Sequence, residues 1–154
     1  MLHIRKASKS DINIYFKWAN DPEVRNNAFN QQPITYEKHK IWFSEKINND
    51  KCYLYVICDD GNPLAQVRFD IEEQCAVISY SLDHKYRGHG YGRKVLQLAI
   101  NTFFDEQTST RQLKALVKCN NIASNKIFQN LGFHMVDNQN NQNIVYYTSI
   151  NIDV

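Results

Sequence analysis

The sequence predicts an α/β (α+β) fold in which strands and helices follow one another in the order βααβββαβαββ. Two observations carry this prediction. Helical spacing of apolar residues dominates the first third of the chain, and strand-like runs follow it. A strand then turns directly into a helix through Gly88, Gly90 and Gly92. With 154 residues and no shift in composition, we expect one domain spanning 1–154 around a single core.

The N-terminal elements are a strand and two helices. Apolar and charged residues alternate over 2–6, which predicts a half-buried strand. Apolar residues at helical spacing predict a helix over 11–18. Pro22 ends it, because proline restricts the residue before it and is able to open a new helix. Thr35 is a typical N-cap for the next helix, which we expect over 36–47.

Three strands and the glycine-containing turn form the middle of the chain. An almost continuous apolar run over 51–58 predicts a central strand, and turn residues at 59–62 predict a hairpin to the second strand, 63–70. The third strand, 74–82, is rich in β-branched and aromatic residues. Helical spacing then predicts a helix over about 90–105.

The C-terminal part is predicted as one strand, one helix and a final strand pair. A short alternating run gives a strand over 113–117, and apolar residues on one helical face give a helix over 124–131. The last two strands, 133–136 and 144–150, are expected to pair across a turn over 137–143 that is rich in asparagine and glutamine.

The turn Tyr86-Arg87-Gly88-His89-Gly90-Tyr91-Gly92-Arg93-Lys94 is the most informative stretch. Glycine has no Cβ to block a ligand and adopts backbone angles that other residues avoid. Successive N–H groups can therefore converge on an anion at the positive end of the following helix, beside the charge of Arg87, Arg93 and Lys94. The spacing matches neither the P-loop nor the dinucleotide fingerprint. A tight turn without a ligand is the alternative interpretation.

Two motifs in this half of the chain resemble those of one enzyme superfamily. Arg87-x-x-Gly90-x-Gly92 resembles the acetyl-CoA pyrophosphate loop of the GNAT N-acetyltransferases. Asn121-Ile122-Ala123-Ser124, followed by Phe128 and then Gly132-Phe133, resembles a later segment of the same family. The resemblance implies the GNAT fold, a mixed and mostly antiparallel sheet that splays at the cofactor cleft. It also implies acetyl-CoA as co-substrate, direct attack of an amine on the thioester, and no metal.

The resemblance further assigns residues to the cofactor. Backbone N–H groups of the turn would hold the pyrophosphate, the end of the preceding strand would pair with the pantetheine arm, and Asn121 would contact the same arm. Ser124 either contacts this arm or only caps its helix. The residues assigned to the cofactor are Ser81, Leu82, Arg87, Gly88, His89, Gly90, Tyr91, Gly92, Asn121, Ser124 and Phe128.

The catalytic candidates are Ser79, Tyr80 and His84. Phe128 stands where many family members have a tyrosine that protonates the departing thiolate, and phenylalanine has no proton to give. Tyr80 and Tyr91 are chemically able to replace it, with packing or a position at the rim as the alternative for each. Departure of the thiolate without a proton donor also stays open, because a thiol is a fairly good leaving group. The strand before the turn lacks the carboxylate that family members often use as a base. Ser79 is therefore a candidate anchor for a water chain and His84 a candidate base, with a solvated loop histidine as the alternative.

The N-terminal third is assigned to the acceptor. Trp18-Ala19-Asn20-Asp21-Pro22-Glu23-Val24-Arg25-Asn26 and the later His39-x-x-Trp42-Phe43 resemble the GNAT enzymes that acetylate the 4-amino group of nucleotide-linked amino sugars of the pseudaminic acid type. Arg25 is able to hold a diphosphate, and Trp42 to stack on a base or a sugar. Core packing of these aromatic residues is the alternative. The candidate substrate-binding residues are Arg25, His39, Trp42 and Arg68.

Two other functions stay open on the sequence alone. One is an N-terminal protein acetyltransferase of the ribosomal-protein type, whose members share a similar Trp…Asn-Asp opening. Such an enzyme is expected to carry acidic residues that select a basic peptide, and no clear acidic patch is visible beside the expected cleft. The other is a module that binds acetyl-CoA without turning it over, which Phe128 and the missing strand carboxylate keep open.

The resemblance implies a small-molecule amine as the partner, and the bulk properties of the chain point to no other class of partner. A formal net charge of +2 gives no argument for nucleic acid or an anionic membrane surface. No apolar run approaches the roughly 20 residues of a membrane span, and no export signal is visible, so we expect a cytoplasmic protein. The four cysteines lack metal-binding spacing and are expected to be free, unreactive thiols. Family members often dimerise, so a homodimer is a further expectation.

Overall fold

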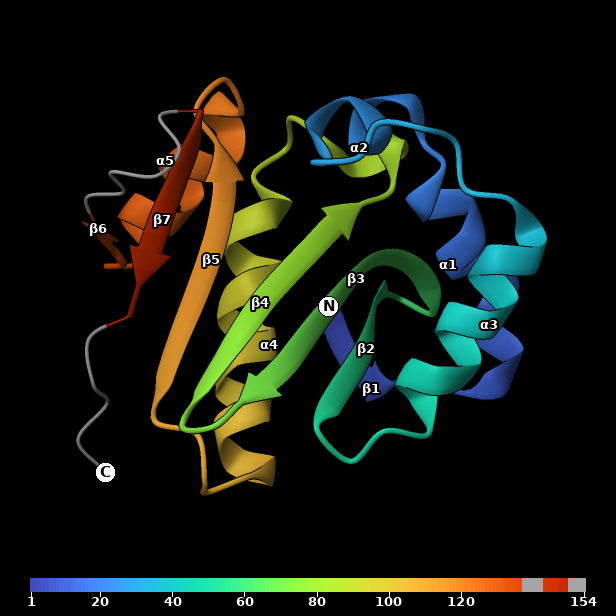
Figure 1. Cartoon of the computed structure of the whole chain (residues 1–154), viewed down its shortest axis with the longest axis horizontal. Helices are drawn as coiled ribbons and strands as arrows, with labels where there is room; N and C mark the ends of the chain where they lie inside the picture. Colours follow the sequence, from blue (N-terminus) through green and yellow to red (C-terminus); the bar gives the residue numbers. More distant parts are fainter. Residues whose placement is uncertain (137–142, 150–154) are drawn as a thin grey trace.

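A computed structural model describes residues 1–136 and 143–149, which form one seven-stranded sheet with helices on both faces (Figure 1). The strand order is β1-β2-β3-β4-β5-β7-β6. The strands are β1 (Leu2–Lys6), β2 (Cys52–Asp59), β3 (Asn62–Glu72), β4 (Cys75–Leu82), β5 (Gln112–Lys118), β6 (His134–Val136) and β7 (Ile144–Thr148). The α-helices are α1 (Ile12–Ala19), α2 (Pro22–Asn27), α3 (Tyr36–Ile47), α4 (Tyr91–Glu106) and α5 (Ile122–Asn130). Two short 3-10 turns are η1 (Lys9–Asp11) and η2 (His84–Tyr86).

The predicted fold class is confirmed. The predicted helices differ from the observed ones in two places, the omission of α2 and the first residue of α5. The predicted element order omitted α2, which forms because Pro22 occupies its first turn and the Asp21 carboxylate accepts hydrogen bonds from the N–H groups of Glu23 and Val24. Helix α5 begins at Ile122 and not at 124, because Asn121 is its N-cap. The predicted turn over 137–143 lies for the most part outside the described residues, as does the end of the last predicted strand.

Two apolar clusters lie on the two faces of the sheet. Successive side chains of a strand point to opposite faces, so Tyr55 and Ile57 of β2 join the α4 cluster, whereas Leu54 and Val56 join the cluster of α1 and α3. Figure 1 shows α4 running along one face of the sheet, and α1 and α3 lying together away from it. We call the face that carries α1 and α3 the outer face.

Strands β4 and β5 separate soon after they begin. They are the one parallel pair among the described strands, and their register covers only Cys75–Gln112, Ala76–Leu113 and Val77–Lys114. On its other edge β4 pairs antiparallel with β3 as far as Leu82. From Ile78 onward, therefore, one edge of β4 has no strand partner, and Figure 1 shows the two strands diverging. This separation of the two strands is the splay that the family resemblance implied, and we use the name cleft for the region between the strand ends.

Two further observations concern membrane-spanning helices and the cysteines. No helix within residues 1–136 and 143–149 is both long enough and apolar enough to cross a bilayer. Cys52, Cys58 and Cys75 are free thiols, as expected, and Cys52 and Cys58 both pack against the α1–α3 cluster.

Candidate functional site

The glycine turn at the start of α4 has the geometry of an anion cradle. Gly88 and Gly90 adopt left-handed backbone angles, with φ of 76° and 78°, and Gly90 is the N-cap of α4 without a side-chain cap. A Cβ built at either position would meet nothing within 4 Å, so the space above this backbone is open. The first N–H groups of the helix thus lack an intrahelical partner and face an unobstructed surface at the positive end of the helix dipole.

Gly92 serves a different purpose from the two glycines before it. A Cβ on Gly92 would lie 2.5 Å from Cδ1 of Ile127 and 3.9 Å from Cδ1 of Leu82. The helix α4 therefore approaches α5 so closely that a larger residue at position 92 would require the Ile127 side chain to move. Tyr91 is likewise turned away from the cradle, because its hydroxyl donates to Oδ2 of Asp59 over 3.3 Å.

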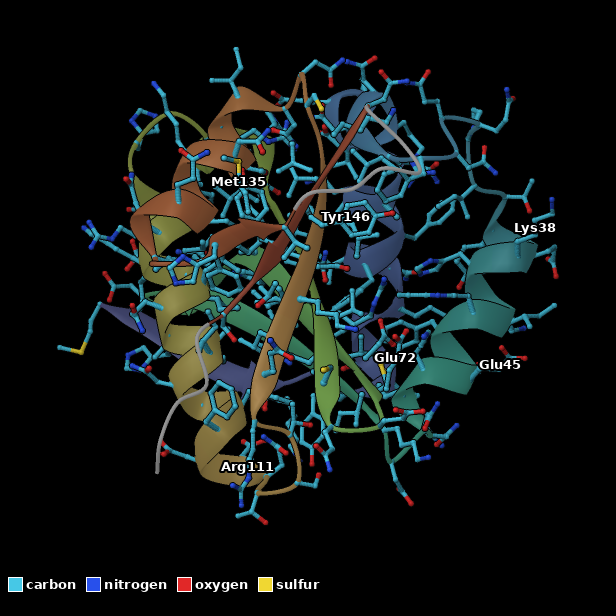
Figure 2. All side chains as sticks on the ribbon, turned by 60° about the vertical axis from the view of Figure 1, so that its left-hand side comes forward. Lys38, Glu45, Glu72, Arg111, Met135 and Tyr146 are labelled. Carbon is cyan, nitrogen blue, oxygen red and sulfur yellow. The ribbon has the colours of Figure 1, made fainter. Side chains whose placement is uncertain are left out.

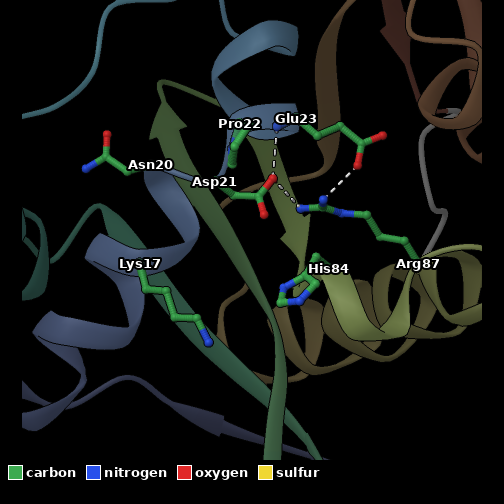
Figure 3. Close-up of a pocket in the computed structure, with 7 residues that line it drawn as sticks. All are labelled: Lys17, Asn20, Asp21, Pro22, Glu23, His84 and Arg87. Atoms are coloured by element: carbon green, nitrogen blue, oxygen red, sulfur yellow. Dashed lines mark hydrogen bonds and ion pairs between the residues drawn. The ribbon is translucent and has the colours of Figure 1, made fainter.

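The side chain of Arg87 is directed away from the cradle and toward α2. Its guanidinium forms ion pairs with Asp21 at 3.0 Å and Glu23 at 2.7 Å, and it donates to the carbonyl of Leu82 at 2.9 Å (Figure 3). This corrects the expectation that its charge adds to the cradle. The three contacts border an open cavity of about 550 Å³ lined by Lys17, Asn20, Asp21, Pro22, Glu23, His84 and Arg87.

Two hydroxyl groups are in contact at the cleft, on the inner face of the sheet, which is the face that carries α4. The phenol of Tyr80 on β4 lies 2.7 Å from Oγ of Ser124 in the first turn of α5. Ser124 does not cap its helix, because the Asn121 side chain holds that position and accepts from the Ser124 N–H. Phe128, one turn further along, is only 2% exposed and packs its ring against that of Tyr80.

The outer face of β3 and β4 is polar. The register places Gln66 opposite Ser81 and Arg68 opposite Ser79. Arg68 stacks on the ring of Trp42 at 5.1 Å, donates to Asp70 at 2.8 Å, and reaches the hydroxyl of Ser79 at 3.5 Å. Lys46 on α3 completes the group with a 2.6 Å contact to Asp70.

Two cations face a single carboxylate in this group. Burial raises the pKa of Asp70, but the charge of Arg68 and the hydrogen bond from Lys46 outweigh it, so the pKa lies below its ordinary value. Asp70 is therefore a carboxylate at neutral pH, and the group formed by Lys46, Arg68 and Asp70 keeps one net positive charge.

The comparisons with known proteins decide the family. The model of the family described as acetyltransferase (GNAT) domain matches residues 1–134. The chain belongs to the GNAT acetyltransferases. It is thus an acyltransferase, as the two sequence motifs indicated. No curated protein matches the sequence.

Solved structures of several acetyltransferases share the fold. Spermidine N-acetyltransferase from Vibrio cholerae, in complex with CoA and spermine, has a TM-score of 0.81 at 15% identity, over 96% of this chain and 94% of that chain. The ribosomal L7/L12 alpha-N-protein acetyltransferase RimL, in complex with CoA, has a TM-score of 0.81 at 19% identity, over 97% and 93%. An aminoglycoside acetyltransferase in complex with CoA has a TM-score of 0.81 at 12% identity, over 97% and 94%. At these identities the likeness shows the fold alone.

Two residues that we predicted to bind the acceptor have structural roles in this acetyltransferase. His39 is 2% exposed, and its Nε2 lies 2.8 Å from the carbonyl of Ile12. Burial also lowers the pKa of His39, which keeps the ring neutral. Arg25 donates to three backbone carbonyls, those of Ala19, Asn30 and Gln32. These contacts fix the loop after α2 and engage Nε and Nη1 of the guanidinium.

His84 and Ser81, two further predicted residues, differ in their exposure to solvent. The side chain of His84 is 58% exposed at the cavity beside Arg87, and its Nδ1 lies 3.4 Å from the buried carboxylate of Asp83. Ser81 is buried and accepts a hydrogen bond from Gln66. Of the predicted catalytic residues, Ser79 lies on the outer face and Tyr80 on the inner one, so the structure does not bring the three together.

Asp83 links α1 to the start of the cradle and was not singled out from the sequence. Its carboxylate is buried and accepts from Nε1 of Trp18 at 3.0 Å and from the N–H of Lys85 at 3.1 Å. Burial raises its pKa, whereas these hydrogen bonds and the charge of Lys17 lower it, and the result is a pKa below the ordinary value.

Asp83 should therefore make stability depend on pH in the acid range. A carboxylate whose pKa is lower in the folded state stabilises it above the unfolded pKa of about 3.9, and this contribution is lost as the pH falls through the folded value. An Asp83→Asn variant is expected to melt below the wild type at neutral pH and to approach it below about pH 4. Melting temperatures measured across this range check this, and a gap that stays constant with pH would contradict it.

No group of three or more metal-binding side chains lies together in the part of the chain that the structure describes.

The ion pairs of Arg87 with α2 and the group around Asp70 were missed from the sequence, because their members are far apart along the chain. A signal was nevertheless present for the second, since Arg68 and Asp70 stand two apart in a predicted strand and so share one face.

Proposed function

We propose that this acetyltransferase moves the acetyl group of acetyl-CoA to the 4-amino group of a nucleotide-linked amino sugar. The observation that carries the proposal is the position of β4 between two surfaces. Its free edge and the adjoining cradle suit a pyrophosphate-bearing cofactor, and its outer face, with Ser79 beside Arg68, suits a phosphate-bearing acceptor. A ternary complex on β4 would hold the amine and the thioester side by side.

The cofactor would be held mainly by backbone groups. The N–H groups over 87–92 would bind the pyrophosphate, supported by the dipole of α4 and by the exposed Arg93 and Lys94. The pantetheine arm has amide groups of its own, and it would pair with the free edge of β4 at Ser81 and Leu82. Asn121 is already engaged as a helix cap through its oxygen, so its NH₂ group is the part that would face the arm.

The acceptor would lie on the outer face. Trp42 offers an aromatic surface, and Arg68, held by that ring and by Asp70, offers its remaining N–H groups to a phosphate. The net positive charge of this group disfavours polycationic amines and favours anionic ones. Lys114 on β5 is exposed and stands in register with Val77, which adds a third cation to the same face, after Lys46 and Arg68.

Acceleration would come from positioning and from polarising the thioester carbonyl. The amine must lose a proton, and Ser79 is placed to anchor the water that takes it, because its hydroxyl lies on the acceptor side of β4 and is oriented by Arg68. His84, on the far side of Arg87, is the less suitable base in this geometry.

A thiol-release assay with acetyl-CoA tests the proposed function. Parallel reactions contain a UDP-linked 4-amino sugar, a peptide with a free N-terminus, or spermidine. Release with the sugar nucleotide alone is the expected result. Release with the peptide alone would overturn the acceptor assignment in favour of protein acetylation. Binding of acetyl-CoA without release in any reaction would favour a module that only binds.

Removal of the Arg68 guanidinium should weaken the acceptor selectively. An Arg68→Ala variant is expected to raise KM for the sugar nucleotide by about 10- to 100-fold, because a hydrogen bond to a charged group contributes about 1.5–3 kcal/mol, and to leave KM for acetyl-CoA unchanged. Steady-state kinetics measure both constants. Arg111→Ala is the control for loss of charge, since Arg111 is exposed at the far end of the sheet (Figure 2). Equal effects of the two substitutions would contradict a specific contact.

A further inference from the structure

The hydrogen bond between Tyr80 and Ser124 joins the two sides of the cleft. Tyr80 lies on the part of β4 that no longer pairs with β5, and Ser124 lies on the helix that follows β5. Their 2.7 Å contact therefore joins β4 to α5 beside the free edge of β4, along which the proposed cofactor would lie. Tyr80 as a whole is a partly buried residue.

The face of α5 that carries Ser124 also carries Phe128, whose ring has no polar atom. Ser124 and Phe128 are four residues apart and so share one face of α5. The Phe128 ring stands edge-on to that of Tyr80, with centroids 6.0 Å apart. Phe128 itself cannot donate a proton, whereas Tyr80, whose ring it contacts, carries a hydroxyl.

We propose that Tyr80 is the general acid that protonates the departing CoA thiolate, and that Ser124 is its positioning residue. This inference rests on the proposed use of acetyl-CoA but not on the identity of the acceptor. In this arrangement the Ser124 hydroxyl donates to the phenol oxygen, one of the two directions that the contact allows, so that the phenolic proton is free for the thiolate.

The reaction balances with these groups. The amine nitrogen bonds to the thioester carbon, the C–S bond breaks, and the sulfur keeps the electron pair and takes the Tyr80 proton. The nitrogen of the new amide loses one proton to water. Solvent returns a proton to the phenolate, which the Ser124 hydroxyl stabilises until then. The products are the acetylated amine and CoA with a free thiol.

The surroundings of Tyr80 agree with a group that begins the reaction protonated. Burial raises the pKa of Tyr80, and the Ser124 hydrogen bond lowers it by a smaller amount. General acid catalysis of this kind typically contributes about 10²- to 10⁴-fold.

A binary complex with CoA tests the inference without any acceptor. The pH midpoint for alkylation of the bound CoA thiol by iodoacetamide is measured for the wild type, Tyr80→Phe, Ser124→Ala and the double variant Tyr80→Phe/Phe128→Tyr. Loss of a donor to the thiolate is expected to raise the midpoint by about 1 pH unit in Tyr80→Phe and by less in Ser124→Ala. The double variant returns a hydroxyl on the adjacent ring and should restore most of the difference.

Tyr80→Phe keeps the ring and its packing, and calorimetric CoA affinity and the melting temperature confirm that the cleft is intact. An unchanged midpoint in Tyr80→Phe with bound CoA would overturn the role of Tyr80. A shift that accompanies lost CoA affinity and that Phe128→Tyr does not reverse would make Tyr80 a packing residue and overturn it as well. Failure of the wild type to bind CoA would instead overturn the proposed cofactor, and the general acid with it.

Discussion

A Gly90→Val variant is expected to bind acetyl-CoA at least about 100-fold more weakly than the wild type while it remains folded. Gly90 has a φ of 78° and opens α4 with free space above its backbone. A valine there places methyl groups over the N–H groups that would hold the pyrophosphate. Loss of two charge-assisted hydrogen bonds of about 1.5–3 kcal/mol each is sufficient for this effect.

Isothermal titration calorimetry with acetyl-CoA measures the loss, and thermal melting monitors the fold. A valine in left-handed backbone costs about 1–2 kcal/mol by itself, so a control with the same strain is needed. Gly132→Val provides it, because Gly132 has a φ of 87° and equally open surroundings at the end of α5. If both variants bind acetyl-CoA as tightly as the wild type, the cradle is not the pyrophosphate site.

A Phe103→Ala variant is expected to lose about 3–5 kcal/mol of unfolding free energy, a large share of the roughly 5–15 kcal/mol available to a domain. Phe103 is fully buried, stacks on Phe69 with centroids 4.1 Å apart, and meets Tyr53 edge-on at 5.1 Å. These contacts hold α4 on the sheet, so truncation leaves a cavity between them.

Chemical denaturation measures this change as a lower midpoint. Phe104→Ala is the matched control, because the adjacent side chain is only partly buried against the same cluster. Its loss should be clearly smaller. Similar midpoints for the two variants would show that α4 is not anchored chiefly through Phe103.

The fold was largely predictable because its signals are local. Helical and strand periodicity predicted every helix and strand that contributes to the two apolar clusters, and the glycines predicted the turn where α4 begins. The short α2 was omitted from the predicted order because six polar and apolar residues give no periodic pattern. Its signals, Asp21 and Pro22, were present at the cap and at the first position.

The site was only partly predictable, because periodicity does not show which partner a side chain meets. His39 and Trp42 are three apart on α3, yet one is enclosed by the core and the other meets Arg68 on the outer face. Tyr80 and Ser124 are 44 residues apart, and only the crossing of β4 and α5 brings them together. Such pairs depend on tertiary contacts that no local pattern contains.

The attachment of α2 to Arg87 has a consequence for local unfolding. Six residues are too few for a stable isolated helix, so α2 depends on its Asp21 cap and on the ion pairs of Asp21 and Glu23 with Arg87. Arg87 lies at the edge of the glycine turn. A ligand that immobilises this turn would therefore slow amide hydrogen exchange in 22–27 as well, even though it need not contact α2.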